Sequence, residues 1–193
     1  LDRTGHLATV ATQRALADAG WNGESDDEND EDGAGRGLVL GTMFGSLRTI
    51  SEFDRRALTA GPMYAKPMDF ANSVLNAAAG QAAIWHGLDG VNATVSGGPA
   101  AGAAALAYAG DLLRCGRARQ LLAGGAEELA LESCLGFERA GWLTESAAAR
   151  PFDRSRDGFL LGEGAALLAL EDSATAARRG ERAKRPAWPA VRS

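Results

Sequence analysis

Apolar residues along this chain follow two patterns, and each pattern predicts a kind of element. Short continuous apolar runs bounded by glycine predict strands that are buried on both faces, at 37–41, 91–96, 120–125 and 164–171. Apolar residues at helical spacing predict helices at about 3–19, 47–58, 70–86, 99–114 and 172–179, with a short helix between the third and fourth strands. This alternation predicts a layered α/β fold in which helices cover both faces of one sheet.

The predicted helix at 99–114 differs from the others because alanine, leucine and glycine occupy several of its faces. We therefore expect this helix to be buried. Three of the other predicted helices end just before residues that break helical geometry, namely Gly20, Gly61 with Pro62, and Gly87.

The composition is that of a globular chain that packs on small side chains. Of 193 residues, 46% are hydrophobic, 25 are glycine and only 6% are aromatic. No apolar stretch approaches the roughly 20 residues that span a bilayer, and the first residues do not form a signal peptide. We expect one domain over 1–180, a disordered basic tail over 181–193, and no membrane partner.

The formal net charge of -5 comes from one segment. Seven acidic residues lie between Glu24 and Asp32, so the rest of the chain carries -5 + 7 = +2. Neither value indicates a nucleic-acid partner. We predict that 22–35 is a mobile surface loop. Calcium binding is the alternative, although the segment lacks the ligand spacing and closing glutamate of an EF-hand.

Few residues offer catalytic or metal-binding chemistry. Cys115 and Cys134 lack metal-ligand spacing, which favours free thiols in a reducing, cytoplasmic compartment. His6 and His86 both lie in predicted helices, and no serine, cysteine or carboxylate is spaced to form a triad with either one. We therefore expect no metal, no cofactor, and structural or surface roles for both histidines.

The turn at 96–102 joins a predicted strand to a predicted helix. A cysteine or serine at the start of such a helix would gain nucleophilic character from the helix dipole. Pro99 occupies that place instead, and proline suits the first helical position but has no nucleophilic atom. The turn lacks the glycine spacing of a dinucleotide-binding loop, and 41–45 is too short for a P-loop and has no lysine.

The most distinctive segment is 151–165, where charges of both signs, glycines and two phenylalanines precede a strand. A salt-bridged surface loop is one interpretation. An ordered loop built for a defined contact is the other, in which Phe152 and Phe159 are buried and the charged residues pair, namely Asp153, Arg156 and Asp157.

This segment resembles the signature loop of β-ketoacyl synthases, the condensing enzymes of fatty acid and polyketide synthesis in the thiolase superfamily. Further motifs of that family occur in family order across about 1–180, at 41–45, 76–90, 94–96 and 123–127. The resemblance implies a thiolase-like layered α-β-α half, the N-terminal half of a ketosynthase, incomplete at both ends.

The resemblance also implies that the catalytic residues are missing. In the family a cysteine nucleophile begins the helix after the strand that 94–96 matches. Counting back from the glycine turn at 123–125, Pro99 occupies the nucleophile position, and Cys115 lies a full helix later. The family's two catalytic histidines and conserved lysine belong to a C-terminal half that this sequence does not contain. We therefore expect no catalytic residue here and no condensation by this chain alone.

A sub-class of the family that lacks the cysteine, the chain length factors, pairs with an active ketosynthase and shapes its acyl tunnel; most carry glutamine at that position. The resemblance implies a dimer with a ketosynthase subunit, or with a second copy, through 92–96 and 70–86, with acyl carrier protein as a further partner. Two alternatives stay open. One is a split or truncated enzyme for decarboxylative Claisen condensation of acyl and malonyl thioesters, and the other is a non-enzymatic acyl-binding remnant.

Overall fold

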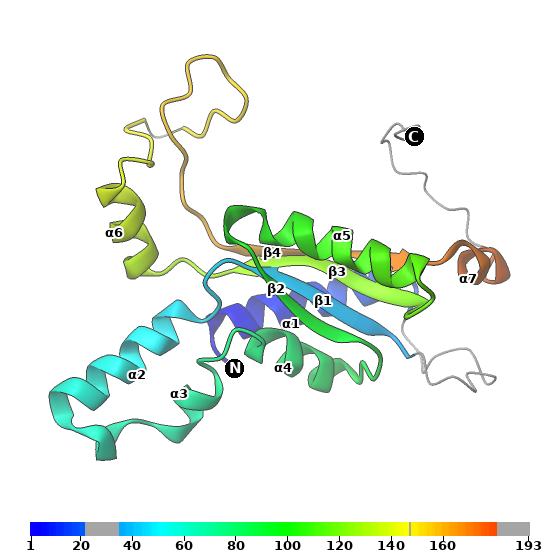
Figure 1. The fold of residues 1–193 in the computed structure, drawn as a ribbon, viewed down its shortest axis with the longest axis horizontal. Helices are drawn as coiled ribbons and strands as arrows, with labels where there is room; N and C mark the ends of the chain where they lie inside the picture. Colours follow the sequence, from blue (N-terminus) through cyan, green and yellow to red (C-terminus); the bar gives the residue numbers. More distant parts are fainter. Residues whose placement is uncertain (22–34, 147, 181–193) are drawn as a thin grey trace.

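The computed structural model describes residues 1–21, 35–146 and 148–180 (Figure 1). The acidic loop predicted at 22–35, apart from its last residue, and the predicted tail lie outside the described residues. In chain order the elements are α1 (Arg3–Asp18), β1 (Gly37–Thr42), α2 (Leu47–Ala60), η1 (Pro62–Tyr64), α3 (Pro67–Ala71), α4 (Ala77–His86), β2 (Asn92–Ser96), η2 (Gly98–Ala100), α5 (Ala101–Arg114), β3 (Gln120–Glu127), α6 (Leu131–Arg139), β4 (Gly164–Glu171) and α7 (Ser173–Arg178).

The four strands form one mixed sheet in the order β2-β1-β3-β4. β1 runs parallel to both its neighbours, with Gly41 opposite Val95 of β2 and Gly125 of β3. β4 runs antiparallel to β3 over the full length of both strands. Among the described residues, β2 and β4 are therefore the edge strands of the sheet.

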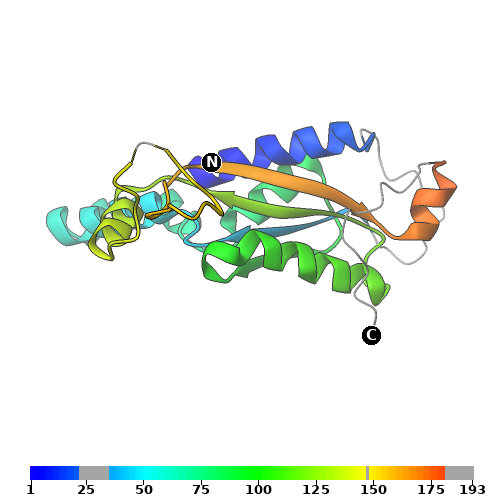
Figure 2. The same ribbon diagram turned by 90° about the horizontal axis from the view of Figure 1, so that it is seen from above.

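Helices cover both faces of the sheet, as the sequence predicts (Figures 1 and 2). On one face, Leu38, Leu40 and Leu122 pack against alanines of α1 and α4. On the other face, Val39 and Leu121 pack against alanines of α5. Successive residues of a strand point to opposite faces, so a sheet covered on both sides requires the continuous apolar strands seen in the sequence.

The prediction of a single long helix over 70–86 is wrong. The chain forms the short helix α3, a non-helical stretch from Asn72 to Asn76, and then α4. In the break, the Ser73 hydroxyl donates a hydrogen bond to the carbonyl of Phe70 at 2.7 Å. Short polar side chains compete in this way for backbone groups that a helix would otherwise use, and the stretch therefore turns.

The prediction that the helix at 99–114 is buried is wrong for its outer face. Only Ala101, Ala105 and Ala109 are buried, and their spacing of four places them on one stripe. Tyr108 is 45% exposed. Alanine on the remaining faces is explained by its high helix propensity and needs no cover, because it exposes little apolar area.

The segment from α2 to α3 projects away from the sheet as an arm, residues 47–71 (Figure 1). No residue of α2, η1 or α3 is buried. The arm is held together internally, because the rings of Phe53 and Phe70 lie 5.9 Å apart and Arg56 pairs with Asp69 at 2.8 Å. The arm is therefore held together by its own side chains, and it joins the body at both of its ends, before α2 and after α3.

Candidate functional site

The first turn of α5 lies directly on the sheet because three glycines allow it. A methyl group added to Gly41 would overlap the backbone of Ala101 and Gly102. A methyl group added to Gly125 would lie 3.2 Å from the Cα of Gly102. Such close backbone approach is possible only without Cβ atoms. It fixes the strand-to-helix turn over the C-terminal ends of β1 and β3.

Pro99 lies in this turn, as the sequence predicts. Gly98 has φ +68°, a left-handed conformation that favours glycine, and Pro99 lies within the 3₁₀ turn η2 that leads into α5. Proline fits there because its missing N–H would have no helical partner. The position therefore offers no atom for covalent catalysis.

An open cleft of about 530 Å³ lies beside this turn, at the C-terminal ends of the parallel strands and the start of β4. Its lining is made mostly of glycine and alanine: Gly41, Thr42, Met43, Gly98, Pro99, Ala101, Gly102, Gly125, Ala126, Glu127, Gly164, Ala165 and Ala166. None of these lining residues carries a thiol or an imidazole. The cleft can therefore hold an uncharged chain against small side chains, but it has no strong nucleophile and no histidine base.

The carboxylate of Glu127, at the end of β3, accepts hydrogen bonds from the last residue of β1 and the two residues after it. It accepts hydrogen bonds from the Thr42 hydroxyl at 2.8 Å and from the amides of Met43 and Phe44 at 2.6 and 3.0 Å. With its oxygens occupied by three donors, Glu127 shapes the cleft wall and is not placed as a general base.

Glu128 is a buried carboxylate that sequence reasoning missed. It is 4% exposed and accepts a hydrogen bond from the Arg48 amide in the first turn of α2 at 2.8 Å. Burial raises the pKa of the Glu128 carboxyl, although the Arg48 amide opposes that rise. The signal available in the sequence was the pair of acids directly after a buried strand.

The loop at 151–165 is ordered through backbone and hydroxyl contacts. Phe159 packs edge-on against Phe137, with ring centroids 5.1 Å apart. The carboxylate of Asp157 accepts a hydrogen bond from the Thr144 hydroxyl at 2.6 Å, and this contact lowers the pKa of Asp157. Glu163, near the end of the loop, is paired with Arg3 of α1 and accepts a hydrogen bond from the Leu129 amide at 3.3 Å.

Two expectations for this loop are wrong. Phe152 is 99% exposed and Phe159 is 37% exposed, so neither ring is fully buried. The carboxylate of Asp153 accepts from Ser155, and the Arg156 guanidinium donates to the carbonyl of Asp153 at 3.0 Å, so these two charged groups meet backbone and hydroxyls. Hydrogen bonds within this tight turn therefore satisfy the charged groups of Asp153 and Arg156, and the ring of Phe152 is left exposed to solvent.

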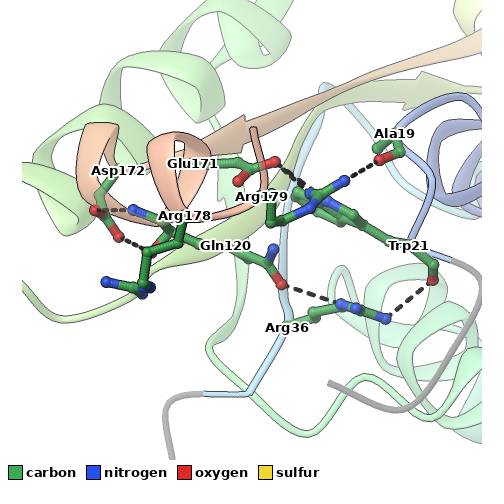
Figure 3. Close-up of polar contacts among 9 residues, drawn as sticks. Ala19, Trp21, Arg36, Gln120, Glu171, Asp172, Arg178 and Arg179 are labelled. Carbon is green, nitrogen blue, oxygen red and sulfur yellow. Dashed lines mark hydrogen bonds and ion pairs between the residues drawn. The ribbon is translucent and has the colours of Figure 1, made fainter. Parts of the chain in front are cut away.

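A second polar cluster lies at the opposite end of the sheet, around Trp21 (Figure 3). Trp21 is 2% exposed, and the guanidinium carbons of Arg36 and Arg179 lie 5.7 and 5.9 Å from its ring centroid. Its indole N–H donates to Glu171 at 3.3 Å, and Arg179 donates to the same carboxylate oxygen at 2.6 Å and to the Ala19 carbonyl at 2.8 Å. These contacts join α1, β1, β4 and α7, so we assign the cluster a structural role.

The histidines and cysteines lie apart from the cleft lining. The ring Nε2 of His86 lies 3.0 Å from the Thr9 carbonyl oxygen, so this nitrogen donates and links α4 to α1. His6 and Cys115 are exposed, and Cys134 is a free thiol on α6. Across 1–21, 35–146 and 148–180, no three or more His, Cys, Asp or Glu side chains gather as a metal site, and no helix is long and apolar enough to cross a membrane.

The protein is a layered α/β protein with a cleft at the ends of its parallel strands. Comparison with known proteins gives its family. The family described as "Beta-ketoacyl synthase, N-terminal domain" matches residues 1–176. The chain belongs to this family of ketosynthase-like proteins of fatty acid and polyketide synthesis, and it has the thiolase-like fold that the sequence predicts.

Individual relatives agree with this assignment. The chain is 36% identical to 3-oxoacyl-[acyl-carrier-protein] synthase 2 of Rhizobium meliloti (strain 1021) over 90% of this chain and 42% of that one. The ishigamide ketosynthase/chain length factor structure superposes with a TM-score of 0.81 at 30% identity, covering 94% of this chain and 44% of that one. A type II polyketide ketosynthase in complex with its acyl carrier protein gives 0.74 at 28% identity, covering 92% and 45%. The chain thus spans less than half the length of these relatives.

Proposed function

We propose that this chain is a ketosynthase-like subunit that performs no condensation by itself and pairs with an active ketosynthase in fatty acid or polyketide synthesis. The observation that supports the proposal is Pro99 in the turn before α5, to which the resemblance, counted back from the glycine turn at 123–125, assigns the family's nucleophile position. An acyl-enzyme requires a nucleophilic side chain, and proline has none.

The edge strand β2 and the helix α4 are the surface we propose for the partner. Asn92 and Ser96 at the two ends of β2 are exposed, and a strand with one unpaired edge can hydrogen-bond to a strand of another subunit. On α4, Ile84 is 85% exposed and Trp85 is 70% exposed. Large apolar side chains this exposed favour a protein contact over solvent.

The cleft gives the subunit a role in the pair. Its glycine and alanine lining accepts a thin, uncharged chain and can limit the path of a growing acyl chain without forming a bond to it. An acyl carrier protein, which one solved relative binds, is the proposed source of that chain. This role is that of a chain length factor, as in the ketosynthase/chain length factor relative.

Co-expression with an active type II ketosynthase tests the proposal, with sedimentation velocity as the readout. We expect a stoichiometric complex that survives dilution to micromolar concentration, and malonyl decarboxylation only when the ketosynthase is present. A chain that stays monomeric beside every ketosynthase tried would rule the proposal out. Condensation after addition of a separate C-terminal half would instead support a split enzyme.

A further inference from the structure

A second pocket, of about 440 Å³, lies at the opposite end of the sheet from the cleft, where α5 ends and α7 begins. Its lining residues are Leu113, Gly116, Ala118, Arg119, Asp172, Ala174, Thr175 and Arg178. This lining carries two guanidinium groups and one carboxylate. We call it the arginine pocket. Guanidinium groups pair most strongly with carboxylates and phosphates, so the lining favours an anionic occupant.

The carboxylate of the arginine pocket is bound to the first turn of α7. Asp172 is the N-cap of that helix, and its side chain accepts hydrogen bonds from the amides of Ala174 and Thr175 at 2.9 and 3.0 Å and from the Thr175 hydroxyl at 2.6 Å. The Thr175 hydroxyl oxygen in turn accepts from the Arg178 guanidinium at 3.0 Å, which orients this cation at the pocket. Asp172 is thus a capping residue, and one positive charge of the lining remains in excess.

The acidic segment 22–34 is joined to the body of the protein beside the arginine pocket. Directly before this segment, Trp21 has the guanidinium carbon of Arg179 at 5.9 Å from its ring centroid. Shortly after the segment, the Arg36 guanidinium donates a hydrogen bond to the Gln120 side chain at 3.1 Å (Figure 3). Arg179 and Gln120 each directly follow an arginine of the pocket lining. Both ends of the segment are therefore neighbours of the pocket.

The segment 22–34 has the charge and the length to occupy this pocket. It holds seven acidic residues and no basic residue. Like charges so close in sequence repel one another, and nearby guanidinium groups reduce that repulsion. A chain spans at most about 3.3–3.6 Å per residue, so a segment of this length that leaves and re-enters beside the pocket can reach roughly 20 Å out and back. The pocket lies well within that reach.

We propose that the acidic segment 22–34 binds in the arginine pocket, where its carboxylates pair with Arg119 and Arg178. The chain thus carries the ligand of its own pocket. This contact ties the connection between α1 and β1 to the ends of α5 and α7, and it closes the pocket to other anions. The proposal is independent of the proposed function, because neither the cleft at Pro99 nor the surface of α4 takes part in it.

Carbodiimide cross-linking of the full chain tests this contact, because the reagent joins a lysine amine to a carboxylate that pairs with it. The sequence has two lysines, Lys66 and Lys184. Arg178→Lys combined with Lys184→Arg therefore places one amine at the pocket and keeps its positive charge. Lys66, exposed on the arm, is the built-in control (Figure 1). Peptide mass spectrometry should find position 178 joined to carboxylates of 22–34 in at least about tenfold higher yield than Lys66, since the tether concentrates the segment at the pocket.

Salt and protein concentration separate this contact from its alternatives. In 1 M NaCl the yield at position 178 should fall at least about threefold, because the Debye length is then only about 3 Å. It should not change with protein concentration, because the contact lies within one molecule. Equal yields at position 178 and Lys66, a yield that salt leaves unchanged, or a yield that rises with protein concentration would each overturn the proposal.

The basic tail is the competing partner for the acidic segment. If 22–34 joins Lys184 in the unsubstituted chain while position 178 of the variant stays unlinked, the tail binds the segment and the proposal is wrong. If Arg178→Lys does not fold, Arg119→Lys in the same background places the amine on the other arginine of the pocket, and the same comparison with Lys66 decides.

Discussion

At the ends of β1 and β3, Gly41 and Gly125 present only backbone to the first turn of α5. This approach places Pro99 at the cleft, because any side chain at those glycines would push the helix away from the sheet. The glycine motifs by which the chain resembles its family thus have a direct physical meaning. They position the strand-to-helix turn whatever residue occupies position 99.

We predict that Gly41→Ala destabilises the fold by about 2 kcal/mol, because the new methyl group meets the backbone of Ala101, which cannot move without shifting α5. Urea unfolding with an unchanged m-value measures the effect. Gly80→Ala in α4 is the control, since a methyl group there meets nothing within 4 Å. That variant should be more stable by about 0.5–1 kcal/mol. Equal destabilisation in both variants would contradict this account of the turn.

The sequence could identify Pro99 but not the two glutamates beside the cleft. Pro99 is found by counting along a local strand–turn–helix pattern. Glu127 and Glu128 take their roles from partners 80 or more residues earlier in the chain, at the start of α2 and just before it. Only the pairing of β1 with β3 brings these segments together, and no local spacing predicts that pairing.

At the scale of elements, the strands were predicted well because an apolar run covered by helices on both faces carries its own signal. The helices at 3–19 and 47–58 were also confirmed, with small changes at their ends. The helix predicted at 70–86 failed because apolar residues continue across a break set by the side chain of Ser73. Helical spacing reports burial, and it does not report such local competition for hydrogen bonds.

We predict that Arg179→Ala destabilises the chain by about 2 kcal/mol. Arg179 and Glu171 are both largely buried, at 20% and 15% side-chain exposure, so the variant leaves a buried carboxylate without its cation. The same change would loosen α7 and expose the face of Trp21, which tryptophan fluorescence can follow. Thermal unfolding measures the stability.

Arg114→Ala provides the comparison for this element. Arg114 pairs with Asp111 at 2.5 Å, but these side chains are 73% and 60% exposed. An exposed pair contributes little, so this variant should change stability by less than about 0.5 kcal/mol. A smaller loss for Arg179→Ala than for Arg114→Ala would show that the Trp21 cluster does not fasten α7.

At the scale of the whole molecule, several large apolar side chains are exposed on α4 and on the arm. Ile84 and Trp85 lie on the outer side of α4, and Met63 and Tyr64, at 93% and 69% exposure, lie on the arm. A chain that spans 42% of a relative exposes surfaces that the remaining length of such a protein, or a partner, can cover. The proposed pairing with a ketosynthase gives one of these surfaces a defined use.

We predict that Ile84→Asp weakens the complex with a ketosynthase by at least about tenfold, because a charge would be buried in an apolar contact. Ile84 is 85% exposed, so the melting temperature of the free chain should not change. Leu131→Asp on α6, at 68% exposure, is the control for adding a charge elsewhere on the surface. Equal affinities for the two variants would remove α4 from the interface.

The central claim is that the cleft at Pro99 holds no covalent acyl group, and mass spectrometry of the denatured chain tests it most directly. The chain with Cys115→Ser and Cys134→Ser is incubated with an acyl thioester of acyl carrier protein, and an active ketosynthase serves as the positive control. We predict that the ketosynthase gains the acyl mass while the 20.0 kDa chain, apart from the two substitutions, stays unmodified. An acyl adduct on this chain that survives denaturation would contradict the account.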